Sequence, residues 1–199
     1  MEYISGKNLI EYDKSSRREA YSNVVFCVIL VALFFVLLYY KTFVFMVVSV
    51  KGKSMYDTLN DGDLLIADRT ASYARGDVIV FYDTEIKNEA LIKRVIAVGG
   101  DTVWSEDGYV YLSFTDKDGR IVTEKLNEDY VYKKGVTDFL PTKVPDNCIF
   151  VLGDNRENSS DSRFFGVISE KCVLGVVTDW SLKIKDSSFV SWYKRAIGA

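Results

Sequence analysis

An uncharged apolar run near the N-terminus is the feature that most constrains how this chain can fold. Residues 24–40 read VVFCVILVALFFVLLYY, seventeen residues without a charge, and the three residues before them extend the uncharged run to twenty. At about 1.5 Å per residue, a helix of that length spans roughly 30 Å, the thickness of the hydrocarbon core of a bilayer. Tyr39 and Tyr40 are typical of the membrane interface. We therefore predict one transmembrane helix over residues 23–40.

The sequence after this run predicts that the anchor is retained. A cleaved secretory signal ends in a small-x-small pair, whereas Lys41-Thr42-Phe43-Val44-Phe45 follows here. Four basic residues precede the run and three follow it, namely Lys7, Lys14, Arg17 and Arg18 against Lys41, Lys51 and Lys53. The positive-inside rule then predicts a cytoplasmic segment over residues 1–22 and an extracytoplasmic domain over residues 41–199.

The domain after the anchor has the pattern of a β protein. It is rich in short Val, Ile, Phe and Tyr runs bounded by Gly, Asp and Asn, and it has no long stretch with a helical period. The predicted strands are Phe43 to Val50, Leu64 to Asp68, Asp77 to Tyr82, Glu89 to Val98, Val103 to Leu112, Arg120 to Lys125, Cys148 to Leu152 and Val173 to Trp180. So many short strands indicate a mainly β barrel or sandwich.

A change of composition marks an insertion at about residues 101–147. Charged and turn residues dominate there, and the sequences Glu106-Asp107-Gly108 and Asp116-Lys117-Asp118-Gly119 each separate two strand-like runs. We predict β-hairpins that form a small cap on the main β core. The tail over residues 187–199 is predicted to be a short helix near the membrane surface.

The absence of histidine excludes much chemistry. It removes Ser-His-Asp and Cys-His nucleophiles and every metal site that contains histidine. A net charge of -3 and a pI near 5.1 give no electrostatic footprint for nucleic acid. Three cysteines cannot build a disulfide framework; Cys27 lies in the apolar run, and whether Cys148 and Cys172 pair is open.

A serine hydrolase without histidine can use a lysine as its base, and Lys93 is a candidate. In the run Leu91 to Ile96, the strand period of two places Lys93 and Arg94 on opposite faces, so one of the two cations is expected to be buried. Arginine stays protonated on burial, whereas the pKa of lysine, about 10.4 in water, can fall by several units. The alternative is a solvated strand lysine.

Two further segments offer partners for such a base. Ser54 follows an apolar strand and Gly52, where a nucleophile is exposed to substrate and its own N–H can point at a developing oxyanion; the alternative is a turn serine. The segment over residues 153–166 crowds Asp, Asn, Ser and Arg into fourteen residues after the apolar strand CIFVL. It is either a surface loop or a hydrogen-bonded network that supports an active site.

Taken in order, these segments resemble the type I signal peptidases, membrane endopeptidases with a Ser/Lys dyad (peptidase S26). The resemblance covers roughly residues 20 to 180. Four boxes carry it: Ser54-Met55 with Thr58-Leu59, Arg75 to Phe81, Ile92 to Ile96 with Gly100-Asp101, and Gly153 to Gly166. The short gap between boxes resembles the single-anchor members of Gram-positive bacteria.

The resemblance implies a coiled, antiparallel, β-barrel-like catalytic core with an apolar membrane-associated surface, and no metal or cofactor. It implies that Ser54 is the nucleophile and Lys93 the general base, with Met55 contacting substrate. By the same resemblance Ser159 hydrogen-bonds the lysine ammonium, Asp161 and Arg163 form an ion pair behind the site, and Gly153 and Asp154 frame it. The substrates implied are signal peptides of exported preproteins, cut after small residues of the Ala-x-Ala type at a lipid bilayer.

The chain departs from the family pattern at three positions. Asp57 replaces the proline of the serine box, and Gly99 replaces the proline before Gly100, so two turns lose a residue that fixes φ near -65°. Gly52 stands where some relatives place a serine hydroxyl in the oxyanion hole, which leaves the Ser54 N–H as the main donor.

Three alternatives belong to other classes. The lost prolines motivate a signal-peptidase-like assembly factor or chaperone for secreted or pilus surface proteins, with weak or no proteolysis. A self-cleaving Ser/Lys repressor would need a DNA-binding helix-turn-helix where this chain has an apolar span. A plain anchored receptor domain leaves the ordered boxes unexplained.

Overall fold

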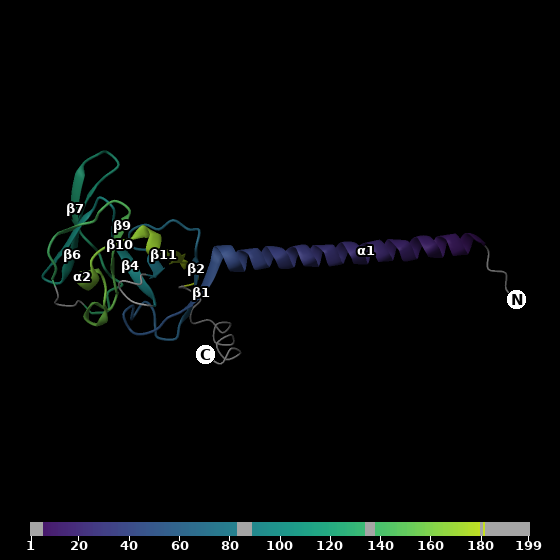
Figure 1. Cartoon of the computed structure of the whole chain (residues 1–199), viewed down its shortest axis with the longest axis horizontal. Helices are drawn as coiled ribbons and strands as arrows, with labels where there is room; N and C mark the ends of the chain where they lie inside the picture. The colour runs from purple at the N-terminus through teal and green to yellow at the C-terminus, as the bar shows by residue number, and fades with distance from the viewer. Residues whose placement is uncertain (1–5, 83–88, 134–137, 180, 182–199) are drawn as a thin grey trace. The chain divides into compact units, whose positions relative to one another are not determined.

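The computed structural model describes residues 6–82, 89–133, 138–179 and 181, and the chain divides into two compact units, Met1–Val44 and Phe45–Ala199 (Figure 1). Trp180, where the last predicted strand was to end, and the predicted tail helix over residues 187–199 lie outside the described residues.

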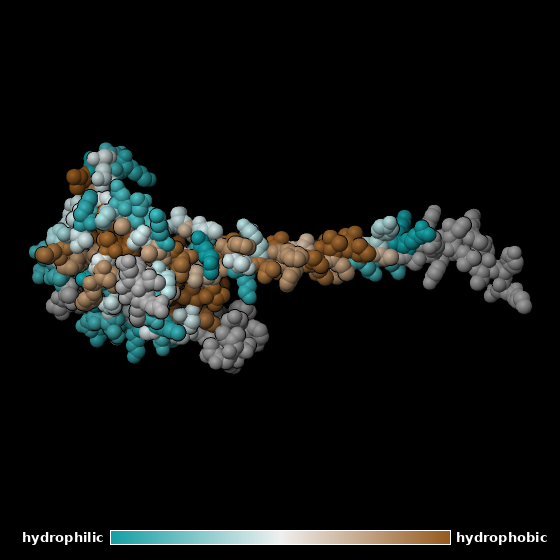
Figure 2. All heavy atoms as spheres, viewed as in Figure 1, coloured by the Kyte–Doolittle hydropathy of each residue, from teal (hydrophilic) through white to brown (hydrophobic). Residues whose placement is uncertain are grey.

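The first unit is one long helix. Helix α1 (Gly6–Tyr39) continues into a π-helical turn, η1 (Tyr40–Val44), and the stretch Arg17–Val44 is long and apolar enough to cross a membrane. Its apolar side chains are exposed, for example Phe35 at 62%, and they form the brown surface of the helix in Figure 2. A helix that is apolar on all sides and unpacked fits a membrane anchor. It begins before residue 23 because no proline interrupts the polar residues that precede the apolar run.

The described residues of the second unit form two sheets, and each strand pair in them is antiparallel. The seven-stranded sheet has the order β1 (Phe45–Ser49), β2 (Leu64–Asp68), β11 (Val173–Val177), β3 (Val78–Tyr82), β4 (Ala90–Val98), β9 (Cys148–Leu152) and β10 (Ile168–Ser169). The four-stranded cap sheet has the order β7 (Ile121–Lys125), β6 (Tyr109–Thr115), β5 (Thr102–Glu106) and β8 (Thr142–Lys143). Short helices η2 (Arg156–Asn158), α2 (Ser162–Phe165) and η3 (Glu170–Cys172) lie between β9 and β11.

These sheets confirm the predicted mainly β, antiparallel fold after one apolar helix. Among the described residues the larger sheet runs from β1 to β10, and no pairing is found between these two edge strands. The predicted run Val103 to Leu112 is two strands, β5 and β6, because Asp107 and Gly108 turn the chain with φ of 52° and 73°. The two-residue strands β8 and β10 were not predicted.

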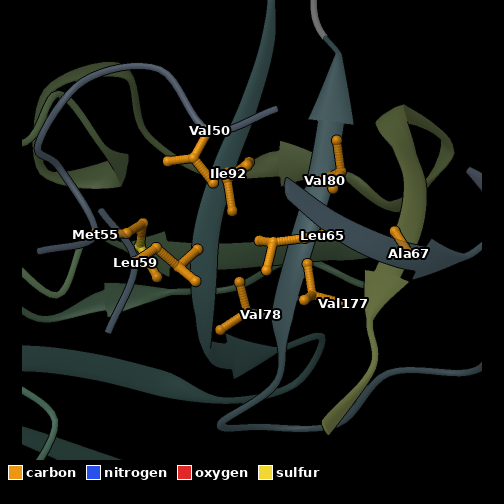
Figure 3. Close-up of a cluster of buried hydrophobic side chains, with 9 residues drawn as sticks. All are labelled: Val50, Met55, Leu59, Leu65, Ala67, Val78, Val80, Ile92 and Val177. Carbon is orange, nitrogen blue, oxygen red and sulfur yellow. The ribbon is translucent and has the colours of Figure 1, made fainter. Parts of the chain in front are cut away.

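The larger sheet is covered on both faces. Along β3, Val78 and Val80 join one buried cluster, whereas Ile79 and Phe81 join another on the opposite face. Figure 3 shows the first cluster, which consists of Val50, Met55, Leu59, Leu65, Ala67, Val78, Val80, Ile92 and Val177. A third cluster joins β4 and β9 to the cap strands β5 and β6. Because β4 lies between covered faces, the charges that it carries are removed from water.

Candidate active site

Ser54 and Lys93 meet although they are 39 residues apart in sequence. The Lys93 ammonium nitrogen Nζ lies 2.8 Å from Ser54 Oγ and 3.0 Å from the carbonyl oxygen of Ile92. Strand β4 holds Lys93 with 3% of the residue exposed, while Ser54 is half-buried in the turn after β1. Arg94 is half-buried, with 11% of its side chain exposed, so Lys93 is the buried cation of the pair.

Backbone hydrogen bonds fix the turn that carries Ser54. The Gly52 N–H donates to Asp61 Oδ1 at 2.7 Å, with Gly52 at φ +85°, a conformation that glycine adopts without strain. The Ser54 carbonyl accepts the Asn155 N–H at 3.0 Å, and the Asn155 side-chain amide donates to the Lys53 carbonyl at 3.0 Å. Among the described residues, no group accepts the Ser54 N–H.

Ser54 and Lys93 lie in a cleft of about 430 Å³. One wall is the end of β1 and the serine turn, residues 48–55, and another is the start of β4, residues 89–93; Asn158 and Ser160 of the polar loop also line the cleft. Met55 lines this cleft but is only 2% exposed, and it packs in the same buried cluster as Leu59 and Leu65. The structure therefore places Met55 at the boundary between cleft and core.

Asp154 is fully buried and neutralises Arg94. Its two carboxylate oxygens accept Arg94 Nε at 2.9 Å and Nη2 at 2.6 Å, and the Thr58 hydroxyl donates to Oδ2 at 2.6 Å. A third Arg94 nitrogen donates to the Gly76 carbonyl at 2.7 Å. Burial alone would lower the pKa of Arg94, but the hydrogen bond and charge of Asp154 outweigh it and raise that pKa.

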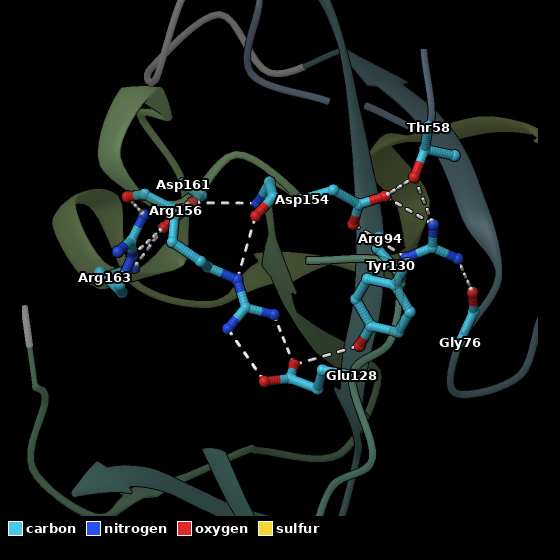
Figure 4. A network of polar contacts seen from close by, with 10 residues as sticks. Thr58, Gly76, Arg94, Glu128, Tyr130, Asp154, Arg156, Asp161 and Arg163 are labelled. Atoms are coloured by element: carbon cyan, nitrogen blue, oxygen red, sulfur yellow. Dashed lines mark hydrogen bonds and ion pairs between the residues drawn. The ribbon is translucent and has the colours of Figure 1, made fainter. Parts of the chain in front are cut away.

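The network continues into the segment that follows strand β7 (Figure 4). The Tyr130 ring lies against the Arg94 guanidinium, 4.0 Å from carbon to ring centre, and its hydroxyl donates to Glu128 at 3.1 Å. Glu128 in turn pairs with Arg156. Sequence reasoning quoted Arg94 and Thr58 in the family boxes without a role, and nothing in the sequence singled out Glu128 or Tyr130.

Asp161 and Arg163 form the pair that the resemblance implied, with Arg163 Nε 2.8 Å from Asp161 Oδ1 and side-chain exposures of 3% and 0%. The other carboxylate oxygen of Asp161 accepts the Gly153 N–H at 3.0 Å. Arg163 also donates to the Arg156 carbonyl at 2.8 Å. The pair therefore stabilises the loop that begins at Gly153 through contacts with its backbone.

Ser159 differs from expectation. Its hydroxyl oxygen is buried and has no hydrogen-bond partner among the described residues, so the expected bond to Lys93 is not formed. A Cβ at Gly153 would collide with the Ser159 hydroxyl and lie 2.5 Å from the Ser54 carbonyl oxygen. Glycine at this position thus permits the close approach of the serine turn to the polar loop.

Two questions from the sequence concern cysteines and metals. The described part of the chain contains no disulfide, so Cys148 is not joined to Cys172. Within the same residues, no group of three His, Cys, Asp or Glu side chains is placed to hold a metal ion.

Comparison with known proteins agrees with the geometry. The family described as signal peptidase, peptidase S26, matches residues 21–180. Signal peptidase I of Bacillus licheniformis is 38% identical over 141 residues, which cover 68% of this chain and 75% of the relative. That of Bacillus amyloliquefaciens is 33% identical over 176 residues, covering 83% and 90% of the two chains.

A solved signal peptidase I from Enterococcus faecalis is 30% identical, with a TM-score of 0.45, and the match covers 54% of this chain and 98% of the other. The family match spans the serine turn, strand β4 and the polar loop described above. This chain belongs to the signal peptidase family, peptidase S26.

Proposed function

We propose that this chain is a membrane-anchored serine endopeptidase that removes signal peptides from exported preproteins, with Ser54 as nucleophile and Lys93 as general base. The observation that carries the proposal is the 2.8 Å contact between Lys93 Nζ and Ser54 Oγ in an open cleft. This distance allows direct proton transfer from the hydroxyl to the amine. Membership of the signal peptidase family supports the substrate class.

The reaction needs Lys93 in its neutral form. Burial in a low-dielectric site disfavours the ammonium, and Lys93 is 3% exposed with two neutral oxygens in contact. Neutral Lys93 takes the Ser54 proton while Oγ attacks the scissile carbonyl carbon, and the Ser54 N–H stabilises the resulting oxyanion. The intermediate collapses as the C–N bond breaks and Lys93 gives its proton to the leaving amine. Water, activated by Lys93, then hydrolyses the acyl-enzyme and restores Ser54.

The same proposal assigns topology and specificity. The apolar helix anchors the chain, the small excess of basic residues before it places the N-terminus in the cytoplasm, and the peptidase domain is extracytoplasmic over residues 41–199. The cap corresponds to about residues 101–147. Cleavage after small residues of the Ala-x-Ala type follows from the family resemblance.

The test is cleavage of a detergent-solubilised preprotein with an Ala-x-Ala site. Ser54→Ala and Lys93→Met are expected to abolish cleavage, while Lys117→Met, an exposed lysine in the cap turn, leaves it unchanged. The wild-type rate should rise with pH between about pH 6 and about pH 10, because only the deprotonated lysine accepts the serine proton. Binding of the preprotein without cleavage would overturn the peptidase and favour the assembly factor that the replaced prolines at Asp57 and Gly99 suggest.

A further inference from the structure

We infer that residues 128–133, here called the return segment, hold the two loops of the active site in register, and that Tyr130 is a positioning residue for the Ser54–Lys93 pair. This inference rests on the proposed function. The return segment lies between the cap strands β7 and β8 in sequence and contributes no residue to the wall of the catalytic cleft. Three sets of contacts connect it to the elements that carry the dyad.

The first set reaches strand β4. The Arg94 guanidinium donates hydrogen bonds to Asp154 and to the Gly76 carbonyl, and the Tyr130 ring covers its face at 4.0 Å (Figure 4). A cation over a buried aromatic face is attracted by the ring quadrupole. Because Arg94 is the neighbour of Lys93 on the same strand, the Tyr130 ring restrains the part of β4 that presents the base.

The second set reaches the polar loop. The Tyr130 hydroxyl donates to Glu128 at 3.1 Å, and Glu128 accepts a hydrogen bond from Arg156 Nη1 at 3.2 Å. Arg156, 6% exposed, then donates through Nε to the Gly153 carbonyl at 3.0 Å. Burial, reinforced by the charge of Glu128, raises the pKa of Tyr130, so its hydroxyl remains a donor at neutral pH.

The third set reaches the serine turn itself. The Tyr132 N–H donates to the Asp154 carbonyl at 3.2 Å, and the Tyr132 ring meets the Tyr56 ring edge-on at 4.6 Å between centres. Tyr56 lies two residues after Ser54. Lys133 forms an isolated parallel bridge with Asn155, whose N–H donates to the Ser54 carbonyl.

These contacts join one short segment to both elements whose separation sets the Ser54–Lys93 distance. A shift of about 1 Å between reacting groups can cost roughly a hundredfold in rate. Since the return segment does not line the cleft, loss of its contacts should lower kcat and leave KM nearly unchanged. A residue that only stabilised the fold would lower the melting temperature without changing kcat of the folded protein.

The experiment compares Tyr130→Leu, Tyr130→Phe and a control, Tyr111→Leu, in the full-length protein. Tyr111 is half-buried on the cap sheet, where it stacks on Trp104. With a preprotein substrate well below each melting temperature, Tyr130→Leu should lower kcat by about tenfold to a hundredfold with KM within about twofold. Tyr130→Phe keeps the ring over Arg94 and should recover most of the rate. An unchanged kcat in Tyr130→Leu, or equal losses in Tyr111→Leu, would overturn the inference.

Amide hydrogen exchange at Asn155 gives a readout that does not depend on cleavage. Its N–H donates to the Ser54 carbonyl, so Tyr130→Leu should speed its exchange by about tenfold, whereas Tyr111→Leu should not. An Asn155 exchange rate equal to wild type would contradict the role of Tyr130. A wild type that fails to cleave, with faster Asn155 exchange in Tyr130→Leu, would overturn the proposed function but not the contact between segment and loop.

Discussion

Lys93 and Arg94 are adjacent cations on one buried strand, and their surroundings differ. Arg94 meets a buried carboxylate at 2.6 Å, a backbone carbonyl and an aromatic ring. Lys93 donates to a serine hydroxyl and to a backbone carbonyl, both neutral. The surroundings of Arg94 stabilise its charge. The Lys93 side chain is instead buried against a hydroxyl and a carbonyl.

On the proposed function, strand β4 carries one structural cation, Arg94, and one catalytic cation, Lys93. Paired buried charges with good geometry hold elements together, and losing one partner leaves an uncompensated charge. A general base must instead change its protonation during the reaction, so a carboxylate partner would oppose its role. The alternation of side chains along β4 separates the two environments by a single residue.

The sharpest test of this comparison is Lys93→Arg, which keeps a cation at the position but removes the possibility of deprotonation near neutral pH. We expect loss of activity by about a thousandfold or more, because general base catalysis contributes roughly 10² to 10⁴ and the nucleophile is then inactive as well. The measurement is kcat for preprotein cleavage together with a melting curve. Lys93→Met, which removes the charge, should be equally inactive; a Lys93→Arg protein that is folded and active would refute the base.

The largest effect on stability is expected at the partner of Arg94. Asp154→Ala leaves the buried guanidinium without its carboxylate and should lower the free energy of unfolding by about 3–5 kcal/mol. Denaturant titration of the protein in detergent measures this change. The exposed pair of Arg120 with Asp118 supplies the control, since Asp118→Ala should cost about 1 kcal/mol or less. Similar losses in both variants would show that Arg94 does not depend on Asp154.

The sequence predicted the parts of the fold that local patterns encode. The strands Leu64 to Asp68 and Cys148 to Leu152 were predicted with the bounds that the structure has, because each is an apolar run between turn residues. The two-residue strands β8 and β10 are too short to carry a periodic pattern, and only their partners define them. The sequence indicated a turn at Asp107 and Gly108, but residues 103–112 around it were also predicted as a single strand.

The candidate site likewise has residues that local sequence patterns predict and contacts that they do not. Ser54 and Lys93 lie in boxes that can be read along the chain, and Asp161 pairs with Arg163 only two residues away. The contact of Tyr130 with Arg94 joins residues 36 positions apart, and no spacing rule points to it. The hydrogen bond expected between Ser159 and Lys93 is absent from the described residues, because side-chain direction in an irregular loop depends on packing against Gly153.

Substitution of Gly153 affects the surroundings of both Lys93 and Arg94, because Gly153 packs against the serine turn and precedes Asp154. A methyl group in Gly153→Ala would meet the Ser54 carbonyl oxygen at 2.5 Å. We expect a loss of about 1–3 kcal/mol in unfolding free energy and a fall in kcat, because backbone must move apart near Ser54. Thermal melting and cleavage rate measure the two effects. Gly119→Ala, in an exposed turn with open space around it, should change melting by its backbone strain alone and leave kcat at the wild-type value.

The smallest expected effect separates the acid sensitivity of the dyad from that of the cap. Asp138 accepts hydrogen bonds from the Gly108 N–H, the Ser105 hydroxyl and the Asp107 N–H, which together lower the pKa of its carboxyl against the opposing effect of burial. A lowered folded-state pKa means that this stabilisation is present above the unfolded pKa and is lost as pH falls through the folded value. The contribution of Asp138 to the melting temperature should therefore be lost only in acid. Asp138→Asn should make the fall of the melting temperature in acid slightly less steep. Cleavage, which depends on neutral Lys93, should already be lost at a higher pH, where the cap is still stable. If activity and melting temperature decline together at the same pH, the loss of activity is unfolding, and protonation of Lys93 does not explain it.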